Sequence, residues 1–463
     1  MNLSIRWLTC VLFILPVGVL ATGLPGGDAR EDTTVSARES LYQAVEAAKK
    51  GETARLHAIT HRLERKDSNY LSTELLPDYL ALLKDEDAQV QMLAVQALGL
   101  LNDAASKDAL CEYLQNKDMQ AFKGRFDRYR QGSLSSETET RQLSWEYQAI
   151  SWAILALGRI GDESVVPLLA SLQDTVDWQI EWVGRPVEKA LGDLGAVKAL
   201  VALPPNADSS RISATSGAIT AIRNPNAVAD LMAVVKDDRI LNDFRLAAVS
   251  ALGAIGTHNV PDFLVRTLDD PNNSQDLRRT AALAAGETGN EVVEGPLLRY
   301  ARDRGSNLRP HAFMGLVLYR PETYLDRWFA TIADPNEDRA FRERLSGFTS
   351  SLPLQPLGGH RDALYTCLHA ADRDGRPVDK IRLDMWCVIS NVLREEPTVV
   401  LTATSTRMRE RMRHPIETRM RQDNPRLAPH ELRTKVDEAI DRLITVYREH
   451  TDQPQGSLRQ APR

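Results

Sequence analysis

Apolar residues recur along most of the chain at the three- and four-residue spacing of a helix face, and one pattern of small and apolar residues returns at near-regular intervals. Its sharpest copy reads Leu-Ala-Leu-Gly-Arg-Ile-Gly-Asp over 155–162. The first glycine, Gly158, aligns with Gly192, Arg223, Gly253 and Gly286, so the marker position returns at nearly equal steps along the chain. This regular period, with two apolar helical patterns per unit, predicts an all-α solenoid of stacked helix pairs, because a single pair cannot bury its own apolar face.

Each unit reads as a helix, an acidic turn, a second helix and a glycine. In the stretch from Ala247 to Gly256, alanines alternate with larger apolar residues, which predicts close helix packing, and the second glycine is placed to end the helix with a positive φ. An apolar helix is expected before each such stretch, as over 260–268. An acidic turn is expected between the two helices of a unit, and Asp237-Asp238 is one such turn.

The acidic turn, the spaced alanines and the Ala-Leu-Gly-x-Ile-Gly-Asp pattern resemble the HEAT family, in particular the HEAT-like repeats first described in phycobilisome lyases. The resemblance covers roughly residues 75–320 and is sharpest at 153–162. It implies the solenoid architecture. It carries no catalytic residue onto this chain and says little about function, because solenoids of this kind bind unrelated partners.

The segment 1–21 has the form of a secretory signal. Arg6 precedes an apolar run that is short for a membrane span, and the run ends in Val19-Leu20-Ala21, small residues that a signal peptidase recognises. We expect cleavage after Ala21 and a periplasmic or extracellular mature protein. An uncleaved membrane anchor is the alternative.

The remaining organisation follows from changes in this pattern. We expect a flexible leader over 22–38, two capping helices within 39–74, HEAT-like repeats over 75–320, a helical region over 321–450 and a disordered tail over 451–463.

The repeat period breaks once. Residues 116–144 are polar, charged and rich in turn-forming residues, and we interpret them as an insertion on a loop. Large aromatic residues follow directly, although aromatic residues are only 6% of the chain. The tryptophans among them are Trp145, Trp152, Trp178 and Trp182. Each pair is spaced to share a helix face, so these residues either fill space behind the inserted loop or form a surface for a protein partner.

His57 and His61 are one helical turn apart, with Glu64 beyond them, a spacing that could hold zinc on one helix face. No glutamate follows His57 as the zinc-protease motif requires, and we favour a solvated face with no metal.

Arginines recur at a fixed distance before the glycine marker at Arg245 and Arg278, and again at Arg309. Asp243 and Asp276 stand just before the first two. Stacked repeats would align these arginines beside acidic groups. The family resemblance implies a ladder that ties adjacent repeats together, and the alternative is a groove for anionic partners.

Removal of the signal leaves three cysteines, Cys111, Cys367 and Cys387, so the chain is no disulfide-rich scaffold. Cys367 and Cys387 each fall near the middle of one helix of an expected hairpin. A disulfide between them and a pair of buried thiols are both open at this stage.

The segment from Arg407 to Lys435 has more than twice as many basic as acidic residues. Its first arginines are Arg407, Arg409, Arg411, Arg413, Arg419 and Arg421. Interleaved methionines make it resemble helices that lie on anionic membranes, but pairing with the acidic remainder of the chain is the simpler alternative. The full chain carries a net charge of −6, which gives no reason to expect nucleic-acid binding.

The sequence contains no phosphate-binding loop, no Gly-x-Ser-x-Gly motif, no Cys-x-x-Cys and no His-Glu-x-x-His. We therefore expect a non-enzymatic scaffold, without a cofactor, that binds a protein partner of unknown identity. The alternatives are a lyase- or isomerase-type enzyme, by analogy with the namesakes of the repeats, and a binder of anionic surfaces through the arginine-rich segment.

Overall fold

The computed structural model describes most of the chain. The described residues are 33–133, 136–175, 181–203, 207–257, 259–352, 357–393, 413, 416–418, 420–421 and 427–451. The expected signal peptide and most of the expected tail lie outside them.

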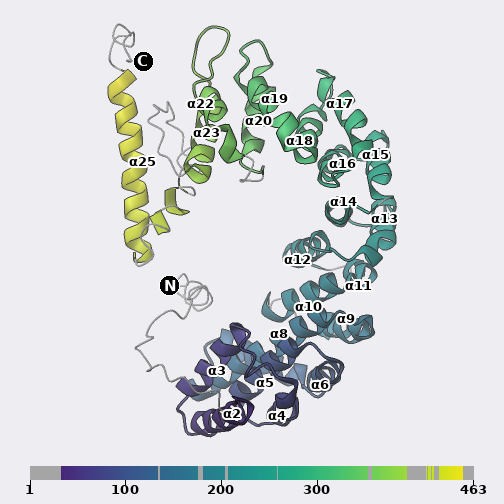
Figure 1. The fold of residues 1–463 in the computed structure, drawn as a ribbon, viewed down its shortest axis with the longest axis vertical. Coiled ribbons are helices and arrows are strands. Elements are labelled where there is room, and N and C mark those ends of the chain that lie inside the picture. Colours follow the sequence, from purple (N-terminus) through teal and green to yellow (C-terminus); the bar gives the residue numbers. More distant parts are fainter. Residues whose placement is uncertain are drawn as a thin grey trace.

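The described chain folds into an arc of paired helices (Figure 1). The outer row is α4 (Leu76–Leu82), α6 (Ala104–Gln115), α9 (Val166–Thr175), α11 (Val197–Val201), α13 (Val228–Lys236), α15 (Val260–Asp269), α17 (Glu294–Arg302), α19 (Pro321–Ala333) and α22 (Arg361–Leu368). The inner row is α5 (Ala88–Leu101), α8 (Glu137–Ile160), α10 (Glu181–Leu194), α12 (Ser209–Thr220), α14 (Asn242–Ile255), α16 (Gln275–Glu287), α18 (Arg309–Tyr319), α20 (Arg339–Thr349) and α23 (Asp379–Val392). The predicted all-α solenoid is confirmed.

Single-turn 3₁₀ helices precede several helices of the outer row or lie between pairs. These are η1 (Thr73–Leu75), η2 (Glu163–Val165), η3 (Pro225–Ala227), η4 (Glu291–Val293) and η5 (Gly358–His360). The first four begin after a Ser, Asp or Asn whose side chain accepts a hydrogen bond from the backbone N–H of the next residue but one, which starts the turn.

The inner row stacks through the small residues of the repeated pattern. A Cβ placed on Gly158 of α8 would lie 2.6 Å from the Cα of Ala190 in α10, so only glycine permits this crossing. Gly253 meets Ala284 of the next inner helix in the same way, at 2.7 Å. The marker glycine is therefore a contact between repeats.

The second glycine of the pattern has the conformation that the sequence predicts. Gly161 ends α8 with φ +77°, and Gly256 ends α14 with φ +61°. This left-handed conformation favours glycine over residues that carry a Cβ.

Two segments that were expected to be a flexible leader and a loop contain helices. The expected leader over 22–38 is already helical from Thr33, where α2 (Thr33–Lys49) begins and pairs with α3 (Ala54–Glu64). Within α2, the side chain of Arg38 donates to Asp78 at 2.9 Å, which ties this segment to α4.

The expected inserted loop over 116–144 is also mostly helical. It contains α7 (Met119–Arg130) and the beginning of α8. Asp118 caps α7 by accepting from the N–H groups of Gln120 and Ala121, and Phe122 is 2% exposed. The capping aspartate and the buried ring outweigh the turn-forming residues that suggested a loop.

After α23 the last helix is α25 (Pro429–Thr451), in which Leu432, Val436 and Ile440 form a buried stripe at a four-residue spacing. No helix in the described ranges combines the length and apolar character needed to cross a membrane.

Candidate partner-binding face

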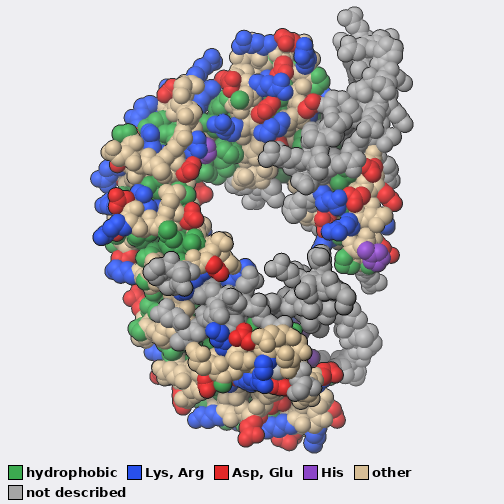
Figure 2. Space-filling view, turned by 180° about the vertical axis from the view of Figure 1, so that it is seen from behind, with side chains coloured by type: hydrophobic (Ala, Val, Ile, Leu, Met, Phe, Trp, Pro, Cys, Tyr) green, Lys and Arg blue, Asp and Glu red, His purple; other side chains and the backbone are tan. Residues whose placement is uncertain are grey.

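The inner helices border the hollow of the arc, and their solvent-facing residues form a concave face (Figure 2). This face combines aromatic residues on α8, small hydroxyl side chains on α12 to α16 and cationic side chains on α16 to α20. Loops of a solenoid vary freely, whereas inner helices hold side chains in fixed register, so this face is the place to look for a partner site.

Trp145 and Trp152 lie two turns apart on α8, and both are only partly buried. The ring of Trp145 lies 5.8 Å from that of His57 in α3. The guanidinium of Arg159 lies over the Trp152 ring at 5.3 Å. Two of the four predicted tryptophans therefore share one helix and leave part of each ring accessible.

The side chains of the other two predicted tryptophans lie outside the described part of the structure. Trp178 lies outside the described residues, and Trp182 belongs to α10 but its side chain is not among those described. The predicted cluster of four stays a prediction.

The helical insertion supports α8 beside Trp145. Arg125 of α7 forms an ion pair with Glu146 at 2.7 Å, and Lys117 approaches the same carboxylate at 3.8 Å. Burial lowers the pKa of Lys117. The insertion thus packs onto the helix that carries the two tryptophans.

The spacing of His57, His61 and Glu64 does not produce a metal site in α3. The Nε2 atom of His57 lies 3.0 Å from the Nε2 of Gln89 in α5, so this ring faces α5 and Trp145. In the described part of the chain, no group of three or more His, Cys, Asp and Glu side chains is arranged to hold a metal.

A shallow groove crosses the concave face over α12, α14 and α16. The residues that line it are Ser209, Ile212, Ser213, Ser216, Thr220, Asp243, Leu246, Ala247, Ser250 and Thr280. Several hydroxyls donate to a carbonyl of the preceding turn in their own helix, as Ser250 does to Leu246. A hydroxyl that donates in this way can still accept hydrogen bonds.

Cationic side chains occupy the same face on the next helices. Arg279 of α16, His311 of α18 and Arg344 of α20 follow one another at the repeat period, one to each inner helix. The pKa of His311 is lowered to about 4, first by burial and then by the charges of Arg279 and Arg344, while Asp276 opposes them. Sequence reasoning missed these three residues, although their spacing was a readable signal.

The predicted arginine ladder exists, and at Arg245 and Arg278 its partners are carbonyl oxygens. The Nε of Arg245 donates to Val235 at 3.0 Å, and that of Arg278 donates to Leu268 at 2.8 Å. Both acceptors lie in the last turn of the outer helix of the same repeat, where carbonyls lack partners within the helix. At these two positions the ladder ties the two helices of a pair. Arg309 reaches both Ala301 of its own pair, at 3.2 Å, and Glu337 of the next repeat, at 2.7 Å, as expected of arginines beside acidic groups that join repeats.

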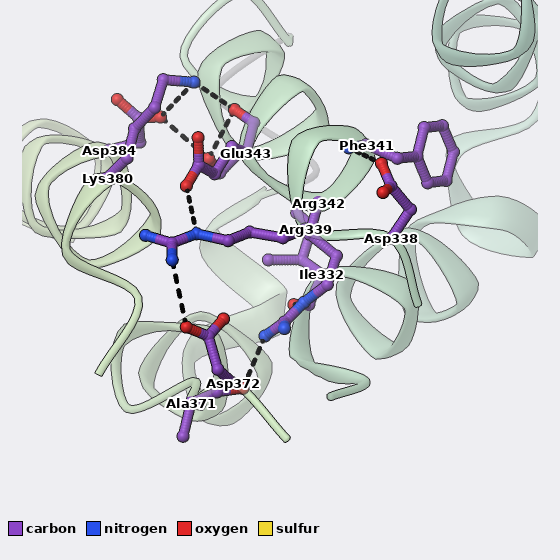
Figure 3. Close-up of polar contacts among 11 residues, drawn as sticks. Ile332, Asp338, Arg339, Phe341, Arg342, Glu343, Ala371, Asp372, Lys380 and Asp384 are labelled. Atoms are coloured by element: carbon purple, nitrogen blue, oxygen red, sulfur yellow. Dashed lines mark hydrogen bonds and ion pairs between the residues drawn. The ribbon is translucent and has the colours of Figure 1, made fainter. Parts of the chain in front are cut away.

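The ladder extends to Arg342, which the sequence analysis missed (Figure 3). Its Nε donates to Ile332 at 2.7 Å and its Nη2 donates to Ala371 at 3.1 Å, although the residue is 1% exposed. Burial lowers its pKa, but an arginine keeps its charge. Arg342 thus joins its own pair to the next repeat.

Arg211 holds the corresponding place at the other end of the ladder. Because α11 is short, the Nη2 of Arg211 reaches Gln173 in α9, at 3.4 Å. Glu188 of α10 is buried in the same region and accepts from Thr215 at 2.5 Å. Burial raises the pKa of Glu188 to about 7, against the opposing charge of Arg211.

A second cleft runs along the turns between α17 and α23, and several of its charged side chains are paired. Arg309 forms a two-pronged ion pair with Glu337 at 3.1 and 2.7 Å, which lowers the pKa of that carboxyl to about 2. Arg339 pairs with Glu343 at 2.9 Å and with Asp372 at 3.2 Å (Figure 3). These contacts fasten successive repeats together, while Arg344, which also lines the cleft, is exposed.

The cysteines are thiols in the structure, and Cys367 and Cys387 are not bridged. The Sγ of Cys367 in α22 donates to the carbonyl of Phe329 in α19 at 3.3 Å, so it is directed at the preceding repeat. Burial raises its pKa to about 12. Of the expected pair of buried thiols, Cys367 is buried and Cys387 is only partly buried.

The arginine-rich segment is described only at Arg413, Arg421 and a few neighbours. Arg413 pairs with Asp437 of α25, and Arg421 pairs with Glu417 at 2.9 Å. Arg407, Arg409, Arg411 and Arg419 lie outside the described residues. Both described arginines thus have the acidic partners expected of a solvated helix, and contact with an anionic surface stays a prediction.

Comparison with known proteins supports the repeat assignment. The family model of the PBS lyase HEAT-like repeat matches residues 151–175, from the second half of α8 to the end of α9. The prediction of HEAT-like repeats is therefore confirmed.

No curated protein matches the chain. A solved structure of human deoxyhypusine hydroxylase in complex with glycerol is similar over 63% of this chain and 98% of that chain, at 17% identity and a TM-score of 0.25. At these values we transfer no activity from it.

Proposed function

We propose that this HEAT-like repeat protein is an exported, non-enzymatic scaffold that binds a protein partner on its concave face. The observation that carries the proposal is the pair Trp145 and Trp152, two large aromatic side chains left partly accessible on one inner helix. Tryptophan is enriched at binding hot spots because it offers a large apolar area that is already ordered.

The rest of the concave face supports the same proposal. The groove over α12, α14 and α16 adjoins the cationic residues of α16 to α20, so the inner helices offer one extended surface. Binding of an extended partner along such a surface is what stacked helical repeats favour.

The export part of the proposal rests on the segment 1–21, with its single arginine, its short apolar run and the small residues at its end. We expect the protein recovered from its host to begin at Thr22. An intact Met1 in the recovered protein would contradict cleavage.

A photo-crosslinking residue placed in the mature protein tests the face directly. It would replace Ser250, which lines the concave groove, or Arg266, which is exposed on the outer helix α15. We expect a specific adduct from position 250 and none from position 266. Equal adducts from both positions would contradict binding on the concave face.

The aromatic part of the site has its own test. Trp152→Ala should weaken the adduct at position 250, because removal of a hot-spot tryptophan costs about 2 kcal/mol or more of binding energy. Val292→Ala is the matched control, since Val292 is 48% exposed in the turn before α17 and lies off the concave face.

A further inference from the structure

We propose that the concave face of α16, α18 and α20 binds an extended acidic segment of the partner protein, with Arg279, His311 and Arg344 as its contacts. This inference rests on the proposed function and specifies the chemistry of the partner.

The three residues belong to the inner helices of three successive repeats, and Arg344 is exposed while Arg279 and His311 are partly exposed. Arg279 has one acidic neighbour, Asp276, at 3.0 Å, and Asp276 is itself two-thirds exposed. Arg344 is exposed and has no ion-pair partner among the residues that the structure describes. Arg344 also lines the cleft along the turns, where its neighbours Arg309 and Arg339 are held by carboxylates.

His311 lies on the helix between those of the two arginines, and one nitrogen of its ring is buried. Its ring packs edge-on against Phe348 of α20, with centroids 5.1 Å apart, and its Nδ1 atom makes no hydrogen bond with the described residues. Because Nδ1 is buried, a ligand on this face would contact the exposed part of the ring.

Few charged groups surround His311. Arg279 and Asp276 face it from α16, and Arg344 faces it from α20. The balance is positive, because the two arginines depress the pKa of the imidazole more than Asp276 raises it. A carboxylate brought to this place would be attracted by both guanidinium groups.

The spacing of the cations fits an extended chain. Packed helices are about 8–10 Å apart, and an extended chain rises about 3.3 Å per residue. A segment that crosses the inner helices would therefore place every third residue near a cation. The hydroxyl-lined groove over α12 and α14 continues in the same direction and has room for the rest of the segment.

A nucleic acid fits this face less well. Phosphates carry charge at much closer intervals than one per repeat, whereas Asp243 lines the concave groove and Asp276 lies beside Arg279. These carboxylates would repel a continuous polyanion but leave room for acidic residues separated by neutral ones.

The test measures binding of a labelled peptide to the full mature protein by fluorescence anisotropy. The peptide repeats Glu-Ser-Gly over about 15 residues, so that a glutamate recurs at about every 10 Å. We expect saturable binding that weakens with salt. The same peptide with glutamine in place of glutamate should not bind.

The variants remove two positive charges either from the inner row of helices or from the outer row. Arg279→Gln/Arg344→Gln should weaken binding at least about tenfold, because two charged hydrogen bonds are lost. Arg266→Gln/Arg302→Gln removes two exposed arginines from the outer helices α15 and α17 and should change binding less than about twofold. Arg344→Glu alone, at an exposed position, keeps the test decisive if the double variant folds poorly.

Three outcomes would overturn the inference. The first is that the inner-row and outer-row variants lose the same binding affinity. The second is that a peptide with all its glutamates in one block binds as tightly as the spaced peptide. The third is that single-stranded DNA of equal charge binds more tightly than the peptide to the same arginines.

The crosslinking experiment separates this inference from the proposed function. If the adduct at position 250 survives Arg279→Gln/Arg344→Gln and the peptide does not bind, only the binding of an acidic segment is contradicted. Peptide binding through these arginines without any adduct from the native host would remove the proposed partner and leave an anion site.

Discussion

Gly286 of α16 and Gly315 of α18 meet backbone to backbone, and a Cβ placed on Gly286 would lie 2.0 Å from the carbonyl oxygen of Gly315. The two inner helices cross at a point where neither carries a side chain. The same arrangement at Gly158 and Gly253 uses an alanine on the facing helix. The inner row is thus packed more closely than larger residues would permit, and this close packing holds the cationic residues of neighbouring repeats near one another.

The first prediction concerns this close packing. Gly158→Ala should destabilise the protein by about 1–3 kcal/mol, because the added methyl group overlaps the backbone of Ala190. Gly217→Ala is the matched control, since Gly217 is also helical and no atom lies within 4 Å of its added Cβ. The control should be neutral or stabilising by about 0.5–1 kcal/mol. Chemical denaturation of both variants measures the difference, and equal midpoints would contradict the packing.

The second prediction concerns the ladder. Arg342→Lys should destabilise the protein by about 1–3 kcal/mol, because one ammonium cannot reproduce the fork that reaches both Ile332 and Ala371. Arg344→Lys, further along α20 and exposed, should change stability by less than about 0.5 kcal/mol. If thermal unfolding ranked the two variants the other way, the assignment of the ladder would be wrong.

The third prediction separates core tryptophan from surface tryptophan. Trp328 is 0% exposed and donates to Thr349 at 3.0 Å, so Trp328→Ala should cost about 3–5 kcal/mol of unfolding free energy. Trp145 and Trp152 are only partly buried, and their alanine variants should cost less. Urea titrations monitored by circular dichroism provide the comparison. A loss at Trp152 as large as at Trp328 would place Trp152 in the core.

The fourth prediction concerns pH. The imidazole of His311 should titrate with a pKa of about 4, against about 6.5 in an unfolded chain. The unfolded chain binds more protons between these values, so stability present above the unfolded pKa is lost as the pH falls toward the folded one. His311→Asn should therefore lose less thermal stability between neutral and mildly acidic pH than the unchanged protein. An NMR titration that gave His311 the pKa of an unfolded chain would contradict the burial.

The fifth prediction concerns the thiols. Cys367 is fully buried, its Sγ donates to Phe329, and burial raises its pKa to about 12. Iodoacetamide should therefore fail to label Cys367 in the native protein and should label it after unfolding, because the thiolate is the reactive form. Peptide mapping under non-reducing conditions is the control, and linkage of Cys367 to Cys387 would contradict the thiol state.

The helices, their pairing and the residues of their closest contacts were predictable from the sequence. The Ala-Leu-Gly pattern fixes which face of an inner helix approaches its neighbour, and the glycine after it fixes where the helix ends, as at Gly161 and Gly256. Both are local properties, because the three- and four-residue spacing and the requirement for a positive φ involve only residues close in the chain.

Local composition was misleading at 116–144, where charged and turn-forming residues suggested a loop. The helix α7 forms there because Asp118 caps it and because Phe122 finds a buried place against the rest of the fold. A capping residue is visible in the sequence, but the burial of one ring depends on what the neighbouring helices offer.

The concave face was decided only by the tertiary structure. The sequence shows that Arg245, Arg278 and Arg309 recur, but not that they reach carbonyl oxygens of their own helix pair. Nor does it show that Arg279, His311 and Arg344 lie on the inner side of the arc. Periodicity assigns residues to faces of single helices, whereas the choice of which face borders the hollow depends on how the pairs stack and how the arc curves.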